Sequence, residues 1–389
     1  MALLGDLVAA RSVNPPGDVT GPAAIAREWL RMRGHEPTAV SLEPAKPNIV
    51  ALAHGTGNGP ARQLVLNAHL DTVEPGDAAL WSVDPLSLTR RDGRLYGLGT
   101  GNMKAAAAAM LHAFDWLARH RQLWSGRLAL TLVADECVFG PAGTAHLLET
   151  RPDLRGDAVI CGEGPGGMNL AIAEKGLAWV LLRAKGRAGQ GMLTERAGSA
   201  PARLAAALVE IDAWNGERAA PPLRALDNDA NIEGLRPSAN VGRIGGDGFV
   251  SRAMSEAVAE IDVRIPPGWT LAEIHERFDR LCEDGAGLAW EPIKGWEPNW
   301  TDPDAAPVAA VRRAASVVRG TEPRPVTRLP ASDGSRWRAL GVPVVCYGPQ
   351  PELASGIDDY VEERDLLDCI AVYALAALDV LASNDQTAE

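Results

Sequence analysis

Apolar residues in the first half of the chain follow two patterns. Three largely apolar runs of strand length occupy residues 64–70, 127–134 and 158–161. Residues 103–117 and 143–150, which lie between these runs, have the composition and spacing of α-helices. Apolar strands that alternate with helices are typical of a mainly parallel sheet covered on both faces. The pattern therefore predicts an α/β fold for this half of the chain.

The pattern changes after about residue 174. The expected elements are then a strand, a helix, two strands, a helix and a strand, at residues 178–185, 199–215, 238–244, 255–265, 270–284 and 286–291. This order is the split βαβ, ferredoxin-like arrangement. The α/β pattern resumes afterwards, with an apolar strand at 343–347 and a final helix at 362–382.

The length of the chain also favours two domains, because 389 residues exceed the usual size of one. We predict that residues 1–174 and 292–389 form a discontinuous catalytic α/β domain. Residues 175–291 are then an inserted α+β domain.

The net charge of −12 narrows the choice of partners. An acidic chain is a poor match for nucleic acid or for an anionic membrane surface. No apolar run has the length needed to span a bilayer, and the N-terminus lacks the pattern of a signal peptide. We therefore expect a cytoplasmic protein whose partner is a small molecule.

Polar residues gather where the expected strands end. In open α/β sheets, ligands bind beyond the carboxyl ends of the strands. Five polar clusters are candidates for such a site, at residues 69–73, 97–104, 134–137, 161–165 and 348–361. Several of them contain the His, Asp and Glu side chains that bind metals or transfer protons.

The order and spacing of these clusters resemble one metallopeptidase family along essentially the whole chain. That family contains aminoacylase, acetylornithine deacetylase, succinyl-diaminopimelate desuccinylase and carboxypeptidase G. Its members hold two zinc ions, which activate a bridging water and polarise the scissile carbonyl. The resemblance implies that the inserted domain is a lid that also mediates homodimers.

Four positions keep the residue that the resemblance implies. His69 matches a metal ligand, and Asp71 matches the carboxylate that orients this histidine. Glu163 matches a ligand carboxylate. Glu136 matches the general base that takes the proton of the attacking water.

Four other positions differ from the family pattern. Asn102 stands where the family has the Asp that bridges both metals, and Cys137 where it has a ligand Glu. Ser355 replaces the second ligand His. Gln190 replaces the lid-domain His that reaches the neighbouring subunit's active site.

These replacements remove most of the metal ligands that the resemblance implies. Dedicated zinc sites normally have at least three good ligands, and His69 and Glu163 are the two that remain. We therefore expect no metal cofactor. The alternative is one zinc ion held by His69, Glu163 and Cys137. Cys137 is interpreted as a small filler residue, with a nucleophilic thiolate as the competing hypothesis.

The substrate side of the expected site lies partly in the inserted domain. Asn240 and Arg264 match positions that bind a substrate carboxylate, and an arginine fork suits that group. The competing interpretation of Arg264 is a surface charge paired with Asp262. Other candidate substrate contacts are Asn102, Ser355, Gln190, Cys137, Ser332 and Asp333. One residue is inserted before Arg336 relative to the family loop, so the pattern assigns Arg336 no role.

The sequence as a whole predicts an enzyme that acts on a small amino-acid-like or N-acyl amino-acid substrate. Glu136 transfers protons in this hypothesis, and His69 with Asp71 forms a second acid-base pair. The reaction is amide hydrolysis, or condensation, cyclisation or acyl transfer in a biosynthetic pathway. A single-zinc amidohydrolase and a non-catalytic binding protein remain as alternatives. We expect a homodimer that forms through the lid domain.

Overall fold

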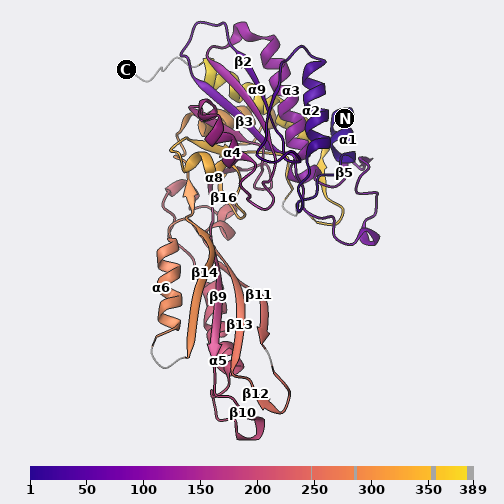
Figure 1. The fold of residues 1–389 in the computed structure, drawn as a ribbon. Helices are drawn as coiled ribbons and strands as arrows, with labels where there is room; N and C mark the ends of the chain where they lie inside the picture. Colours follow the sequence, from indigo (N-terminus) through magenta and orange to yellow (C-terminus); the bar gives the residue numbers. More distant parts are fainter. Residues whose placement is uncertain (247, 284–286, 352–355, 383–389) are drawn as a thin grey trace. The chain divides into compact units, whose positions relative to one another are not determined.

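The computed structural model describes residues 1–246, 248–283, 287–351 and 356–382. By the density of contacts the chain divides into two units, shown in Figure 1. The first unit contains Met1–Ile172, Thr301–Val326 and Ala331–Glu389, and the second contains Ala173–Trp300 and Thr327–Pro330. The two domain boundaries given above, and the role of the second unit as a lid, stay predictions.

A mixed, mainly parallel sheet forms the centre of the first unit. Its strand order runs β1-β2-β6-β3-β7-β17-β8. Strand β3 pairs in parallel with β6 on one side and β7 on the other, and β17 continues the parallel part beside β7. The predicted α/β class is confirmed. The strands are β1 (Thr38–Val40), β2 (Asn48–His54), β3 (Gln63–His69), β6 (Arg127–Val133), β7 (Ala158–Cys161), β8 (Leu170–Glu174) and β17 (Val344–Cys346).

Helices cover this sheet, which explains why its strands are apolar along their length. The buried cluster beneath them includes Val65, Ala129, Val159 and Val344, one from each of four neighbouring strands. The helices are α1 (Ala2–Ala9), α2 (Thr20–Arg31), α3 (Ala105–Arg119), α4 (Thr144–Thr150), α7 (Ala306–Arg319), α8 (Gly334–Arg338) and α9 (Glu363–Ala382).

Helix α3 places the turn before it close to the sheet. Its first five residues are alanines, all buried, and their small side chains allow the helix to approach strand β3 closely. A small antiparallel sheet of β4 (Thr89–Arg91), β5 (Arg94–Tyr96) and β18 (Tyr360–Glu362) packs near the same turn.

The second unit has the predicted α+β arrangement. Its sheet has the order β11-β13-β9-β14, and all three pairings are antiparallel. Two helices cover one face over a core that includes Val180, Ile261 and Phe278. The elements are β9 (Gly176–Lys185), α5 (Ala200–Ala213), β11 (Ser238–Gly246), β13 (Glu256–Ile265), α6 (Leu271–Leu281) and β14 (Leu288–Trp296). Strand β14 is five residues longer at its C-terminus than the pattern predicts, because Lys294, Gly295 and Trp296 continue the pairing with β9 past a bulge.

Four short strands complete the described strands. They are β10 (Gly189–Gln190), β12 (Arg252–Ala253), β15 (Asn299–Trp300) and β16 (Pro325–Arg328). Strands β10 and β12 form a separate two-stranded sheet within the second unit. Among the described residues, no helix combines the length and apolar character required to cross a membrane.

Candidate active site

Three neighbouring parallel strands bring three of the predicted side chains together. His69 is the last residue of β3, Glu136 follows the end of β6 by three residues, and Glu163 follows the end of β7 by two. Because β3 lies between β6 and β7, the carboxyl ends of all three strands meet at one edge of the sheet. All three side chains are buried, at 1%, 8% and 1% exposure respectively.

The imidazole of His69 uses its two nitrogens differently. Nδ1 lies 2.9 Å from the backbone oxygen of Asp71, so Nδ1–H donates to that oxygen. Nε2 faces three oxygens: Asn102 Oδ1 at 3.2 Å, Glu136 Oε2 at 3.5 Å and Glu163 Oε1 at 3.8 Å. The two carboxylates are therefore near the nitrogen but beyond good hydrogen-bonding distance.

Negative charge dominates the surroundings of His69. Burial alone lowers the pKa of a histidine, since it disfavours the charged form. Here the carboxylates of Glu136, Asp71 and Glu163 outweigh burial and raise the pKa of His69 well above its usual value. The pocket thus favours a positive charge at Nε2, either a proton or a metal ion.

Asp71 holds the site together through backbone and side-chain donors. Its carboxylate accepts hydrogen bonds from Asn14 Nδ2 at 2.8 Å, Cys137 N at 3.0 Å and Glu136 N at 3.2 Å. Burial raises the pKa of Asp71, but these donors and His69 lower it to about 2. Asp71 is consequently an ionised positioning residue whose oxygens are already occupied.

A second buried carboxylate, Asp135, shapes the loop that presents Glu136. Lys46 Nζ donates to it at 2.9 Å and Ala142 N at 3.1 Å. Asn14 Nδ2 lies 3.3 Å from the same carboxylate. The sequence did not indicate Asn14 or Lys46, because both lie in loops that are distant in sequence from Asp135 and belong to no motif. Only the fold brings them next to this loop.

Asn102 lies in the turn before α3, and a buried carboxylate fixes that turn. Asp359 accepts hydrogen bonds from Gly99 N at 2.8 Å and Gly101 N at 3.1 Å. Burial nevertheless raises the pKa of Asp359 to about 7. Nearby, burial lowers the pKa of Lys104 to about 8, and its ammonium donates to the backbone oxygen of Ala10 at 3.0 Å.

Cys137 follows Glu136 and carries a protonated thiol. Burial, together with the charges of Asp71, Glu136 and Glu163, raises the pKa of this thiol well above its usual value. A reactive thiolate requires the opposite, namely a neighbouring positive charge that lowers the pKa. These surroundings favour the filler interpretation over the nucleophile.

The loop that contains Ser332 and Asp333 lies near Glu163. Ser332 Oγ accepts from Gly334 N at 3.0 Å. Burial raises the pKa of Asp333 to about 7, and the charge of Glu163 adds to this rise. Arg336, to which the sequence assigned no role, donates to the backbone oxygens of Phe139 and Gly140 at 3.1 and 2.8 Å. Arg336 therefore holds the loop that follows Glu136 in place.

The remaining predicted residues lie elsewhere in the chain. Arg264 and Asn240 are in the second unit. Arg264 Nε donates to Asp262 Oδ2 at 3.1 Å. Asn240 of β11 lies opposite Asp262 of the neighbouring strand β13. Gln190 is exposed in β10. Their contact with substrate stays a prediction. Ser355 lies outside the described residues.

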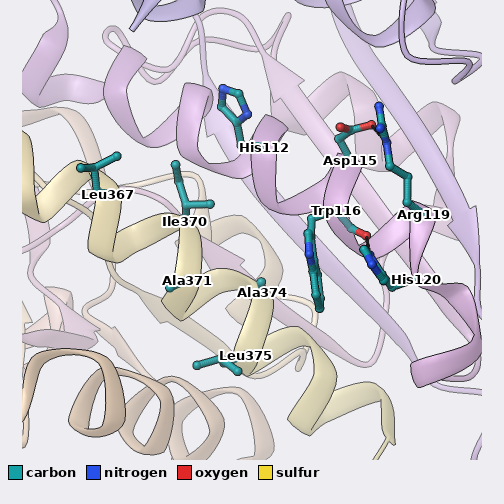
Figure 2. Close-up of a pocket in the computed structure, with 10 residues that line it drawn as sticks. All are labelled: His112, Asp115, Trp116, Arg119, His120, Leu367, Ile370, Ala371, Ala374 and Leu375. Carbon is teal, nitrogen blue, oxygen red and sulfur yellow. Dashed lines mark hydrogen bonds and ion pairs between the residues drawn. The ribbon is translucent and has the colours of Figure 1, made fainter.

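A large groove of the first unit does not coincide with the strand ends. It measures about 730 Å³ and lies between α3 and α9. Figure 2 shows Trp116 and the apolar side chains of α9 along it, with His112, Arg119 and His120 on the α3 side. None of the predicted site residues lines it.

The donor set beside His69 fits a metal ion. One ligand atom from each of His69, Glu136 and Glu163 lies within 4.8 Å of the others. Ligands about 2.1 Å from a tetrahedral ion are separated by about 3.4 Å, which is close to the distances around Nε2. In a second group, one ligand atom from each of His69, Asp71 and Cys137 also lies within 4.8 Å of the others. It suits an ion less well, because Asp71 already accepts three hydrogen bonds.

Comparison with known proteins gives a consistent result. The model of "Peptidase family M20/M25/M40" matches residues 65–379. The chain is 30% identical over 388 residues to a succinyl-diaminopimelate desuccinylase from Xanthomonas euvesicatoria pv. vesicatoria (strain 85-10), with 96% of each chain covered. A succinyl-diaminopimelate desuccinylase from Methylobacterium radiotolerans is also 30% identical over 394 residues, covering 96% of this chain and 94% of that one.

Solved structures agree on the fold. An M20 family metallo-carboxypeptidase, Sso-CP2 from Sulfolobus solfataricus, aligns with a TM-score of 0.75 at 16% identity, covering 98% of this chain and 99% of that one. Human carnosine dipeptidase 1 has the same TM-score at 17% identity, with 98% and 96% covered. A Bacillus subtilis protein described as a dinuclear metal-binding peptidase aligns with a TM-score of 0.70 at 14% identity, covering 98% of each chain.

The expectation that the protein takes no metal cofactor is contradicted by these findings. It rested on counting only His69 and Glu163 as ligands. The fold adds Glu136 Oε2 and Asn102 Oδ1 around the same nitrogen, and the chain matches a metallopeptidase family. Spacing along the sequence could not show that these oxygens converge on Nε2.

Proposed function

Since this chain belongs to peptidase family M20/M25/M40 and is a hydrolase, we propose that it cleaves the amide bond of a small N-acyl amino acid or a similar amino-acid derivative. The observation that carries the proposal is the convergence of Asn102, Glu136 and Glu163 on Nε2 of His69. This buried group combines a metal-ligand set with a carboxylate able to move protons.

The chain's own residues suffice to hold one divalent ion at this place. His69 Nε2, Glu163 and the amide oxygen of Asn102 would be its ligands. Such an ion supplies Lewis-acid polarisation of the scissile carbonyl and makes a water molecule more acidic. We propose that this chain binds only one ion, where members of the family hold two.

Glu136 is the proton carrier in the proposed reaction. Its carboxylate takes a proton from the attacking water and then gives it to the nitrogen of the departing amine. Asp71 keeps Glu136 in place by accepting a hydrogen bond from its backbone N–H. Asp71 also fixes the tautomer of His69, because the imidazole donates through Nδ1 beside it and leaves Nε2 facing the oxygens.

The second unit is proposed to bind the substrate's carboxylate. Arg264 keeps part of its guanidinium accessible, with the side chain 30% exposed, and Asn240 lies one strand away. The relatives named above are succinyl-diaminopimelate desuccinylases, which supports a substrate of the N-acyl amino-acid class. We include Ser332, Asp333, Gln190, Cys137 and Ser355 among the proposed substrate contacts.

We also propose that two copies associate through the second unit. Strand β11 lies at one edge of its four-stranded sheet. An edge strand offers unpaired backbone groups to a second copy, and a two-fold interface uses the same surface twice. Measuring the molar mass in solution tests this part, and a monomer at micromolar concentration would contradict it. The cytoplasmic location remains a prediction.

Hydrolysis is tested with a panel of N-acyl amino acids, by quantifying the free amine and the free carboxylic acid. We expect wild-type protein to release both in equal amounts. Glu136→Gln should lower kcat by about 10²-fold or more, because proton transfer by a positioned side chain contributes that much. If no panel member releases amine, or if Glu136→Gln keeps the wild-type rate, the proposal fails.

A further inference from the structure

Trp179 lies on the face of the second unit's sheet that is opposite the two helices. Its neighbours along β9, Ala178 and Val180, belong to the core that α5 and α6 cover. Because successive side chains of a strand point to opposite faces, the indole of Trp179 points away from that core. The residue is 40% exposed. A large apolar ring therefore meets water at the centre of this sheet face.

Trp179 is part of an apolar strip that runs along β9 on this face. Leu177 and Leu181 stand two residues before and after it, so they point to the same side. Trp296 of β14 lies opposite Leu177 and extends the strip to the next strand. Apolar residues scattered singly on a surface need no explanation, whereas a contiguous exposed group of them indicates a binding site.

Charged side chains border the strip on both sides. Asp262 of β13 lies opposite Trp179 and accepts a hydrogen bond from Arg264 Nε. Lys294 of β14 lies opposite Trp179 on the other side. Its Nζ is 5.7 Å from the ring centroid of Trp179 and 5.3 Å from that of Trp296, which are cation–π distances. An apolar surface with a few polar groups around it is typical of small-molecule sites.

The sheet register sets the distance between Trp179 and the proposed carboxylate site. Arg264 of β13 lies opposite Leu177, so Trp179 is its diagonal neighbour on the same face. Diagonal neighbours in an antiparallel pair are about 7–8 Å apart, a gap that aromatic and long side chains bridge. A short carbon chain separates the carboxylate and the ring of an aromatic amino acid. A ligand of that size can therefore contact Arg264 and Trp179 together.

We infer that Trp179 is a specificity-determining residue whose indole stacks against an aromatic side chain of the substrate. The substrate class is therefore an N-acyl derivative of an aromatic amino acid, with its carboxylate on Arg264 and its ring on Trp179. This inference rests on the proposed function for the carboxylate. The exposed apolar strip around Trp179 supports the aromatic group independently.

Binding of simple acids tests the inference without relying on turnover, because acids without an amide bond are not hydrolysed. Phenylpropanoate and propanoate differ by the phenyl group, and cyclohexylpropanoate carries a saturated ring of similar size. Each acid is titrated calorimetrically into the full-length protein. We expect wild type to bind phenylpropanoate about tenfold or more tightly than propanoate, because the ring leaves water on binding. Stacking should make phenylpropanoate bind about threefold or more tightly than cyclohexylpropanoate.

Trp179→Ala should remove the preference for the phenyl group and leave propanoate binding unchanged. Trp179→Phe should keep most of the preference, because an aromatic ring remains. Trp116→Ala is the matched control, since Trp116 is also 40% exposed but lies in α3 of the first unit, and it should behave as wild type. An undiminished preference in Trp179→Ala would overturn the inference. A failure of the hydrolysis panel with the preference intact would instead overturn only the proposed reaction.

The molar mass in solution separates a substrate contact from a contact between copies. Trp179→Ala should have the same molar mass as wild type. A dimeric wild type with a monomeric Trp179→Ala would assign this sheet face to a second copy and contradict the inference. The three acids keep the inference testable on wild type alone if Trp179→Ala does not fold. Equal affinities of wild type for phenylpropanoate and cyclohexylpropanoate would then overturn the stacking.

Discussion

The carboxylate of Asp71 accepts a hydrogen bond from the backbone N–H of Cys137 at 3.0 Å. This contact joins the residue that orients His69, at the end of β3, to the loop that presents Glu136, after β6. One ionised side chain thereby sets the positions of both a metal ligand and the proposed proton carrier. Cys137 contributes to this contact through its backbone and not through its thiol.

Asp71→Asn should weaken metal binding about 10- to 100-fold, the usual effect of removing a carboxylate that orients a metal-ligand histidine. The new amide group would also face the N–H donors of Glu136 and Cys137 in place of an acceptor. Competition with a chelator measures the metal affinity. Asp6→Asn, at an exposed position of α1, is the control. Equal metal affinity in wild type and Asp71→Asn would contradict the positioning role.

Cys137→Ala should keep activity within about threefold of wild type and leave the metal content unchanged, because the thiol is protonated and is neither nucleophile nor ligand. Steady-state kinetics and metal analysis of the same preparation test both statements. A loss of activity beyond about 100-fold with the metal retained would restore the nucleophile hypothesis. A loss of metal would favour the site that includes Cys137.

Asp359 should make stability depend on pH. Burial raises its pKa to about 7 in the folded state, above the ordinary value of 3.8. A raised pKa contributes stability that is fully present below about pH 4 and is lost as the pH rises through 7. The free energy of unfolding of wild type, relative to Asp359→Asn, should therefore fall by a few kcal/mol between pH 4.5 and 8.5, since three pKa units correspond to about 4 kcal/mol.

Denaturant unfolding at several pH values measures this difference. Asp92→Asn changes an exposed carboxylate in the same way and is the control. If the stability difference between wild type and Asp359→Asn stays constant from pH 4.5 to 8.5, Asp359 ionises normally in the folded protein.

The sequence predicts the main functional side chains of the site because these side chains lie at the ends of predicted strands. His69, Glu136 and Glu163 each lie at the end of an apolar strand or within three residues after it, and parallel strands bring such positions to one edge of the sheet. The α/β class and the α+β insertion follow from patterns of apolar residues for the same reason. These features depend on local order along the chain.

Patterns of apolar residues do not predict contacts between loops that are distant in sequence. Asn14 and Lys46 support Asp71 and Asp135 from segments that carry no periodic signal. Sequence patterns also do not predict the direction of a side chain within a turn, so the sequence could not show that Asn102 Oδ1 faces His69 Nε2. The mistaken expectation of a metal-free site arose from this gap.

The metal content of the protein tests the central claim most directly. Elemental analysis should find about one divalent ion per chain in wild-type protein purified without added metal, since His69, Glu163 and Asn102 supply three ligand atoms. His69→Ala and Glu163→Gln should each lose that ion, and a chelator should abolish amide hydrolysis by wild type. Wild-type protein that carries no metal and keeps its activity in the presence of a chelator would contradict the claim.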